Sequence, residues 1–454
     1  MGHRDGRLGR RARSATAASA MILRDPVHGL VSFEATEFSI VPRLLEAEEV
    51  QRLRRIRQLG LTSLAYPGAD HTRFSHAIGA AHVMTRFIGR LRQIHGELPL
   101  DQRVTSERAR DAVAAAFLHD LGHGPLSHLF EEAVPDGPGH EVWTVRIVLN
   151  PQTAVHRILR DTDPELPQRV ADLIQGRHPL AFLASTVSGT FDVDRCDYLL
   201  RDAHFTGVSY GSFDLDWLVR SLRFGHPQTP NRAPHLAIDG VKGLPAIESF
   251  VLARLFMFQQ VYFHKASRAS EWHFSRILFR IRHLLRSGEM VTPMPPGIES
   301  LLRTGDAELA DYLALDDAVL WSALSSWRSV ADPILSDLCQ RLYARRLFKT
   351  LELFGADRRP ERYAELLERL GQRARASGLD PEYYVGLDEA VDVPFDNSDD
   401  PLAVIFPDDV ARAPQDVSFI LGRLAGETLT RTRLVFPNEL REDLLAYLRS
   451  APLS

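Results

Sequence analysis

Apolar residues recur every three to four positions over most of this chain, the spacing that places them on one face of an α-helix. The pattern predicts helices over 44–60, 73–91, 106–120, 168–175, 190–205 and 246–290. Gly60 is the expected stop of the first helix, since glycine commonly follows a helix end. Residues 21–38 instead predict a short extended segment with a turn at "DPVHG". The fold class is therefore expected to be mainly α.

A Pro- and Gly-rich break, "TPMPPG" at 292–297, divides the helical pattern into two parts. We expect a multi-helix core over 21–291 and a C-terminal helical lobe with a small β element over 298–454. In that lobe the runs "LAVIF" and "TRTRLVF" are β-like, and a closing helix follows Pro437. Residues 1–20 have no apolar period and no apolar run of the kind found in signal peptides, so they predict a disordered N-terminal tail.

Composition and charge narrow the class of protein. With 454 residues, 44% hydrophobic and 25% charged, the chain has the make-up of a soluble globular protein. The net charge of -5 disfavours a dedicated nucleic-acid binder, although the basic run "QRLRRIRQ" leaves nucleic acid open as a partner. Two cysteines exclude a disulfide framework and fit a cytoplasmic protein. No apolar stretch is long enough to span a membrane.

The stretch "FLHDLGHGPLSHLFEE" at 117–132 is the first candidate for chemistry. His119 and Asp120 close an apolar helix just before Gly122 and Pro125, where glycine permits unusual backbone angles and proline blocks continuation. The stretch is open to two interpretations at this point. It is either a histidine-rich polar turn between helices or one part of a metal-dependent active site.

Two separated residues complete a possible ligand set. His76 lies on the apolar face of the helix predicted over 73–91, and Asp194 begins "DRCDYLLRD". Taken singly, such a histidine is more often a hydrogen-bonded core residue and such an aspartate a helix cap. Together with His119 and Asp120 they form a site of two nitrogen and two oxygen ligands, which suits Fe, Mn, Zn or Ni better than Mg or Ca.

The motifs "RFSHAIG", "FLHDLGHGPLSH", "GHE" and "FDVDRCDYLLRD", in this order, resemble those of the HD-domain phosphohydrolases. The chain most resembles the deoxynucleoside triphosphate triphosphohydrolases of the sterile-alpha-motif/HD type, without the sterile-alpha-motif domain. The likeness runs from "RDPVHG" to "VFPNELREDLLAYLRS". It implies an HD-domain core that holds a divalent transition metal on His76, His119, Asp120 and Asp194.

The resemblance also implies a reaction and the residues that carry it. Members of the family hydrolyse a deoxynucleoside triphosphate (dNTP) to a deoxynucleoside and tripolyphosphate. The catalytic positions match His140 with Glu141, and His128 with Glu131; His123 stands beside them. We favour His140 as the general acid that protonates the leaving oxygen, with His128 as the alternative.

Further matching positions imply how the substrate is bound. Arg73, Arg195, Arg254 and Lys265 correspond to residues that grip the phosphates, with Mg²⁺ as a further companion of the nucleotide. Arg254, Tyr262 and Lys265 are expected to share one helix face. The sugar is expected to contact the following residues: Gln58, Leu59, Tyr198, Asp202 and Tyr262.

The sequence also indicates a possible regulatory site, and it is compatible with other functions. Glu46, Gln51, Arg54, Arg345 and Lys349 match an activating-nucleotide site around which family members assemble, so a homo-oligomer, dimer or tetramer, is expected. Met21 and Trp217 replace two basic residues of that pattern. The alternatives are an HD-fold phosphohydrolase, phosphodiesterase or nuclease with another substrate, and a nucleotide-binding regulator without activity.

Overall fold

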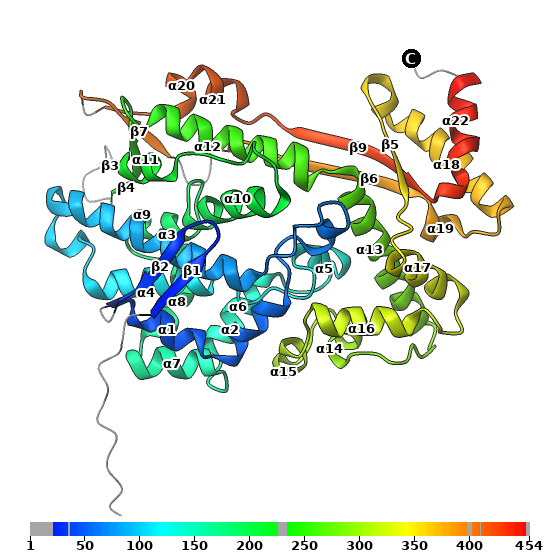
Figure 1. The fold of residues 1–454 in the computed structure, drawn as a ribbon, viewed down its shortest axis with the longest axis horizontal. Helices are drawn as coiled ribbons and strands as arrows, with labels where there is room; N and C mark the ends of the chain where they lie inside the picture. The colour runs from blue at the N-terminus through cyan, green and yellow to red at the C-terminus, as the bar shows by residue number, and fades with distance from the viewer. Residues whose placement is uncertain (1–20, 35–36, 226–233, 397–401, 409, 451–454) are drawn as a thin grey trace, which may run out of the picture.

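The computed structural model describes residues 21–34, 37–225, 234–396, 402–408 and 410–450 (Figure 1). The tail predicted over residues 1–20 lies outside the described residues. Helices dominate and the strands are short, so the prediction of a mainly α fold is confirmed. None of the helices in the described part of the chain is both long enough and apolar enough to cross a membrane.

Three helices form the centre of the larger body: α3 (Arg73–Ile94), α4 (Ser106–Leu118) and α10 (Val193–Thr206). The alanines of α4 at 112 and 114–116 are fully buried, because small side chains let neighbouring helices approach from several sides. Gly79 of α3 faces α10 so closely that a Cβ there would lie 1.8 Å from a carboxylate oxygen of Asp197. This glycine sets the distance between the two helices.

The remaining helices of this body surround the central three. They are α1 (Ile40–Leu45), α2 (Glu48–Arg52), α5 (His128–Ala133), α6 (His140–Leu149), α7 (Ala154–Thr162), α8 (Leu166–Ile174), α9 (Ala181–Val187), α11 (Leu215–Arg220) and α12 (Leu244–Met257). The second body is built on α13 (Lys265–Arg286). It contains α14 (Pro296–Thr304), α15 (Leu309–Leu313), α16 (Asp317–Trp327), α17 (Pro333–Tyr343), α18 (Pro360–Ala376), α19 (Pro381–Tyr384) and α22 (Arg441–Ser450).

Within the described residues, the strands form three small sheets. An antiparallel hairpin joins β1 (Met21–Asp25) and β2 (Gly29–Phe33) around the predicted turn. On the larger body, the second sheet has the order β3 (Leu222–Gly225), β4 (His235–Asp239), β7 (Ala403–Ile405) and β8 (Ala411–Arg412), with β4 and β7 parallel. In the third, β9 (Leu429–Phe436) pairs antiparallel with both β5 (Lys349–Glu352) and β6 (Gly386–Asp392).

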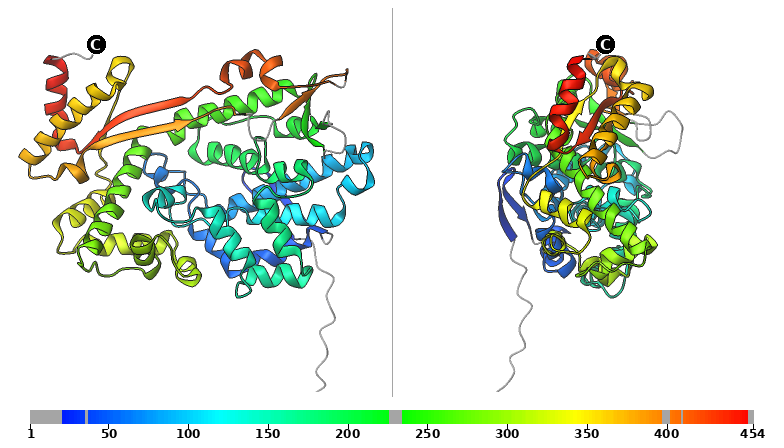
Figure 2. Two further views of the ribbon diagram at one scale, coloured as in Figure 1. Left: turned by 180° about the vertical axis from the view of Figure 1, so that it is seen from behind. Right: turned by 90° about the vertical axis from the view of Figure 1, so that its right-hand side faces the viewer.

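The C-terminal chain runs back across the larger body. Strands β6 and β9 form a long ribbon from the end that holds α18 and α22 to the end that holds α12, α20 (Pro414–Val417) and α21 (Phe419–Leu424), as Figures 1 and 2 show. Phe395 and Leu421 from this return segment are buried in the same apolar cluster as α3 and α4. The end of β6 is thereby held against α12.

Two segments that were each predicted as one continuous helix are broken in the structure. The segment 44–60 is not one helix, since α1 and α2 are separated and a 3₁₀ turn at Leu53–Arg55 leads into an extended residue. The segment 246–290 is broken by a π-helical turn at Phe258–Tyr262 between α12 and α13. In both places the apolar spacing continues across the break, because the residues on either side still face buried neighbours.

The second body holds the histidine-rich stretch from one side. The Tyr312 ring stacks on Trp143 with centroids 3.8 Å apart, and its hydroxyl donates to the carbonyl of Gly122 at 2.7 Å. Asp317 accepts from the amides of Leu126 at 2.8 Å and Arg57 at 3.0 Å. Leu126 has a φ of 58°, an uncommon conformation for a residue with a side chain. The lobe therefore fixes a turn that the local sequence does not favour.

We predict that Tyr312→Phe lowers the free energy of unfolding by about 1–3 kcal/mol. The variant keeps the stack on Trp143 but leaves the buried Gly122 carbonyl without its donor. Thermal unfolding should show a lower midpoint, whereas Tyr343→Phe, which removes a hydroxyl from a ring that is 49% exposed, should not change it. Equal midpoints for the two variants would contradict this role.

Candidate active site

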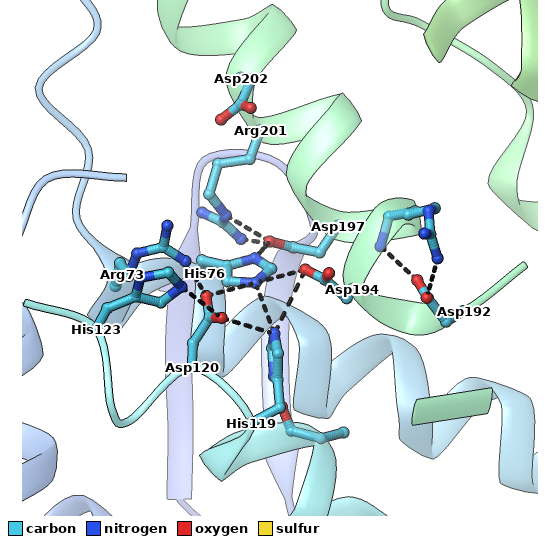
Figure 3. A network of polar contacts seen from close by, with 12 residues as sticks. Arg73, His76, His119, Asp120, His123, Asp192, Asp194, Asp197, Arg201 and Asp202 are labelled. Atoms are coloured by element: carbon cyan, nitrogen blue, oxygen red, sulfur yellow. Dashed lines mark hydrogen bonds and ion pairs between the residues drawn. The ribbon is translucent and has the colours of Figure 1, made fainter. Parts of the chain in front are cut away.

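Three helix ends bring the four proposed metal ligands together (Figure 3). His76 lies in the first turn of α3, His119 and Asp120 directly follow α4, and Asp194 lies in the first turn of α10. The Nε2 atom of His76 is 3.3 Å from Nε2 of His119, 3.4 Å from Asp120 Oδ2 and 3.0 Å from Asp194 Oδ1. His119 Nε2 is 3.4 Å from a carboxylate oxygen of each aspartate.

These distances and charges suit a metal ion. Nitrogen and oxygen ligands bound at 2.0–2.2 Å to one ion lie about 3.0–3.5 Å from each other. Burial lowers the pKa of His76, but hydrogen bonds to Asp194 and Asp197 outweigh it and raise the pKa to about 10. Burial also lowers the pKa of His119, and the charges of Asp120 and Asp194 raise it to about 9. The aspartates thus create a negative potential that favours a cation here, and the residues fit a divalent metal.

A buried carboxylate behind the ligands orients His76. Asp197, fully buried on α10, accepts from His76 Nδ1 at 2.8 Å. The same carboxylate contacts His28 Nε2 at 2.6 Å and receives two bonds from Arg201 at 2.8 and 2.9 Å. Arg201 in turn donates to Asp25 at 2.9 Å. A carboxylate on the outer nitrogen fixes the ring and directs Nε2 toward the metal position.

Sequence reasoning missed these four supporting residues as part of the site. A signal was present for Asp197, because it follows Asp194 by three positions and shares its helix face. Asp25 and His28 belong to the quoted "RDPVHG" motif, but nothing in the sequence says that the first hairpin reaches α10. Only the tertiary fold joins positions 25 and 201.

The turn after α4 is fixed by the ring of His119 and by Thr144 of α6. His119 Nδ1 donates to the carbonyl of Ala116 at 2.9 Å, which leaves Nε2 to face the other ligands. Thr144 donates to the His119 carbonyl at 2.9 Å and accepts from the Gly122 amide at 2.8 Å. A Cβ on Gly122 would lie 2.1 Å from the carbonyl oxygen of His140. Glycine is therefore required where the turn meets α6.

A second imidazole cluster lies beside the metal position. The rings of His123 and His140 stack with centroids 3.9 Å apart, and His128 meets both edge-on. The Nδ1 atoms of His123 and His140 lie 3.3 and 3.1 Å from Glu131 Oε1. The donor atoms of these four residues are close enough to consider a second ion. Two parallel stacked rings, however, cannot both direct an in-plane lone pair to one point, so the geometry does not favour an ion shared by His123 and His140. The hydrogen bond made here joins His140 Nδ1 and Glu131 Oε2, at 3.2 Å.

Burial keeps two of these histidines uncharged. Burial, with the charge of Arg73 as the next cause, lowers the pKa of His123 to about 4. Burial and the charge of His123 lower the pKa of His128 to about 3. Burial raises the pKa of Glu131, but its contacts with the ring nitrogens of His123 and His140 bring it well below its usual range. The cluster therefore contains an ionised carboxylate next to neutral rings.

A cavity of about 410 Å³ opens over the metal position, within the size range of small-molecule sites. Most of the residues predicted for metal binding, catalysis or substrate binding line it: Gln58, Leu59, Arg73, His119, Asp120, His128, His140, Glu141, Asp194, Arg195, Tyr198, Asp202 and Tyr262. Its wall also contains residues that the sequence did not single out: Ile174, Val187, Ser188, Asp192 and Phe258. The cavity combines two arginines near the ligands with aromatic rings.

Polar contacts fix several of these wall residues. Arg73 forms an ion pair with Asp120 and donates to Ser127 at 2.7 Å, so its charge is held beside the ligands. At another part of the wall, Asp202 accepts from Tyr262 at 2.7 Å and contacts His71 Nε2 at 2.7 Å. His123 and Glu131 do not line the cavity and lie behind His128 and His140.

The expectation that Arg254, Tyr262 and Lys265 share one helix face is wrong. The π-helical turn rotates the chain between α12 and α13, and only Tyr262 reaches the cavity. Arg254 lies in a neighbouring cavity. Lys265 lines a third cavity of about 770 Å³, together with Arg345 and Lys349.

The residues predicted for an activating nucleotide are divided between two places. Arg345 and Lys349 line the third cavity, whose cationic residues also include Arg341, Arg346 and Arg441. Glu46, Gln51 and Arg54 are on the α1–α2 segment and do not line it. There Gln51 accepts from Arg54 at 2.8 Å. Within one chain, the two groups do not form a single pocket.

We predict that Asp197→Asn weakens metal binding by about 10–100-fold, the usual cost of losing a carboxylate that orients a ligand histidine. Equilibrium dialysis followed by elemental analysis would measure the affinity. Asp101→Asn, a change of the same kind at an exposed position, is the control. Unchanged affinity in a folded Asp197→Asn protein would contradict the orienting role; restored affinity in Asp197→Glu would support it.

Comparisons with known proteins agree with this geometry. The HD domain family matches residues 73–201, which include all four proposed ligands. The uncharacterized protein YwfO of Bacillus subtilis is 34% identical over 426 residues, 92% of each chain. A deoxynucleoside triphosphate triphosphohydrolase SAMHD1 homolog of Dictyostelium discoideum is 34% identical over 202 residues, 42% of this chain and 37% of that protein.

A similar protein has also been solved. A phosphohydrolase from Bacteroides thetaiotaomicron superposes with a TM-score of 0.76 at 28% identity, covering 92% of this chain and 100% of that one. The likeness thus extends over the C-terminal lobe as well as the HD domain. With the histidine and aspartate cluster at its centre, the chain belongs to the HD-domain phosphohydrolases.

Proposed function

We propose that this protein hydrolyses dNTPs to a deoxynucleoside and tripolyphosphate, using a divalent transition metal such as Fe, Mn, Zn or Ni. The observation that carries the proposal is the donor set of His76, His119, Asp120 and Asp194, three members of which line one cavity. The same cavity is lined by Arg73 and Arg195, and by three residues suited to a sugar: Tyr198, Asp202 and Tyr262. Relatives named dNTP triphosphohydrolases support the substrate class.

Different residues of the site act on different parts of the substrate. A bound divalent metal supplies positive charge for a phosphoryl oxygen and lowers the pKa of water. Arg73 and Arg195 add charge for the phosphates, and Mg²⁺ is expected to accompany the nucleotide. Water adds to the α-phosphorus, the bond from that phosphorus to the 5′-oxygen breaks, and the oxygen takes a proton from a nearby acid.

His140 is the better candidate for that acid. It lines the cavity, and its Nδ1 lies 3.2 Å from Glu131 Oε2, so a carboxylate positions the ring as a proton donor requires. His128 also lines the cavity, but its pKa of about 3 leaves it neutral at pH 7 in the free protein. A neutral imidazole still donates one hydrogen bond, so His128 suits phosphate binding. Glu141 lies on the rim next to His140.

Another part of the cavity wall suits a deoxyribose. The ring centroids of Tyr198 and Tyr262 are 6.5 Å apart, and Tyr262 donates to Asp202. The other oxygen of Asp202 is fixed by His71. A carboxylate held from two sides is a preorganised acceptor for a sugar hydroxyl, and flat rings leave little room for an extra hydroxyl. Gln58 and Leu59 complete this wall.

We further propose that an anion regulates activity from the third cavity. Lys265, Arg341, Arg345, Arg346, Lys349 and Arg441 gather there, with Glu439 as the acidic residue of the lining. Such an excess of positive charge suits a nucleotide phosphate. Because Glu46, Gln51 and Arg54 lie elsewhere on the chain, they would complete a nucleotide site only from a second copy, in a dimer or tetramer.

The reaction is tested by incubating metal-loaded protein with each dNTP and each ribonucleotide and separating products by ion exchange. Tripolyphosphate with a nucleoside is the expected outcome. Pyrophosphate with a monophosphate, or cleavage only of a nucleic acid or cyclic nucleotide, would favour another phosphohydrolase or nuclease function. Binding without turnover would favour a regulator.

Asp120→Asn should reduce the rate by about a thousandfold or more, because a lost ligand charge removes several kcal/mol of transition-state stabilisation. Steady-state kinetics and metal content would be measured together, with Asp101→Asn as the control. Substantial remaining activity would contradict the metal assignment.

Regulation is tested by measuring each dNTP alone and in pairs. A second nucleotide should raise the rate, and Lys349→Ala should reduce that stimulation while the unstimulated rate stays the same. Full rates for every dNTP alone, with no further increase on mixing, would reject the regulatory site.

A further inference from the structure

Arg254 is bound by the return segment of the chain and does not face the catalytic cavity. Its Nη2 atom donates to Asp392 Oδ1 at 2.7 Å, and its Nη1 atom donates to the carbonyls of Val393 and Pro394, each at 2.6 Å. Arg254 comes from α12, and Asp392 is the last residue of β6, whose end lies next to α12 (Figure 1). The contact joins residues 138 positions apart.

Arg254 nevertheless lies close to the catalytic cavity, because only the ring of Phe258 separates them. Its guanidinium is 4.8 Å from the ring centroid of Phe258, and Phe258 lines that cavity. Arg254 itself lines a neighbouring cavity of about 350 Å³. Arg195 and Ser188 line both cavities, so the two spaces meet at those residues. A long polyanion that passes Arg195 from the metal position would reach Arg254.

The Arg254–Asp392 contact is incompletely satisfied. Both side chains are largely buried, with 16% and 11% of their surface exposed. Arg254 Nε and Asp392 Oδ2 are buried and have no hydrogen-bond partner. Burial is also the main cause that raises the pKa of Asp392. A buried pair with unmatched polar atoms gives up part of its stabilisation, so a ligand that satisfies the arginine more fully can replace the carboxylate.

A phosphate chain is such a ligand. It carries several negative charges and pairs of oxygens that match the guanidinium in two parallel hydrogen bonds, whereas Asp392 offers one charge and one bonded oxygen. The advantage of Asp392 is its attachment to the same chain, which gives it a high effective concentration next to Arg254. A bound phosphate chain would therefore compete with Asp392 for one cation.

We infer that Asp392 is an affinity-determining residue that occupies Arg254 in place of the far phosphates of the substrate and must be displaced when a polyphosphate binds. This inference rests on the proposed function for the identity of the substrate. It assigns the second cavity to the distal end of the phosphate chain. It also links β6, and so the C-terminal lobe, to the site through a single side chain.

Asp392→Asn tests the inference because it removes the competing charge with almost no change of shape. Isothermal titration of the metal-loaded protein with inorganic tripolyphosphate, supplied as its Mg²⁺ complex, should show binding roughly tenfold tighter than in the unmodified protein, the effect of losing about 1.4 kcal/mol of competition. With a dNTP, KM should fall while kcat changes little. Glu389→Gln, which removes a charge from an exposed residue of the same strand, should leave both values unchanged.

Arg254→Ala makes the test specific. If Asp392 acts through Arg254, adding Asp392→Asn to Arg254→Ala should have no further effect on tripolyphosphate binding. Equal affinity in Asp392→Asn and the unmodified protein would overturn the inference, as would the same gain in both backgrounds. Because the titration needs no turnover, tighter tripolyphosphate binding by a protein that does not cleave dNTPs would preserve the competition and reject the proposed reaction.

Discussion

The structure depends on how it keeps several ionisable groups buried in one place. His76, Asp120 and Asp197 are almost fully buried between α3, α4 and α10. Isolated buried charges are costly unless they are paired and hydrogen-bonded. Here Arg201 and His28 satisfy Asp197, and Arg73 pairs with Asp120. The pairing leaves the Nε2 edges of two imidazoles and two carboxylates facing each other, which is an arrangement that a cation completes.

Close packing of small residues makes this arrangement possible. Gly79 lets α10 approach α3 near Asp197, and Gly122 lets the turn after α4 meet α6 near His140. The C-terminal lobe adds the Tyr312 hydroxyl and the Asp317 carboxylate to the same turn. The lobe is thus part of the active-site support, and the return segment carries Asp392 to Arg254. Changes in that lobe therefore reach both the turn after α4 and Arg254 in the neighbouring cavity.

The sequence was a good guide to local features and a poor one to breaks and long-range contacts. The helices around His76, His119 and Asp194 follow from apolar spacing, and the motif order identified the metal ligands as candidates. The break at Phe258–Tyr262 was not predicted, because the residues on both sides keep a helical pattern. An unbroken helix would put Arg254, Tyr262 and Lys265 on one face, and the π-helical turn prevents this. Asp197 and Asp392 could not be assigned partners, since those partners are set by tertiary packing alone.

The central claim is that water attacks the α-phosphorus in the cavity above His76, His119, Asp120 and Asp194. Hydrolysis of a dNTP in water enriched in ¹⁸O, followed by mass spectrometry of both products, tests it most directly. The account predicts one ¹⁸O atom in the tripolyphosphate and none in the deoxynucleoside. Label in the 5′-hydroxyl of the nucleoside, or label in a monophosphate released with pyrophosphate, would contradict it.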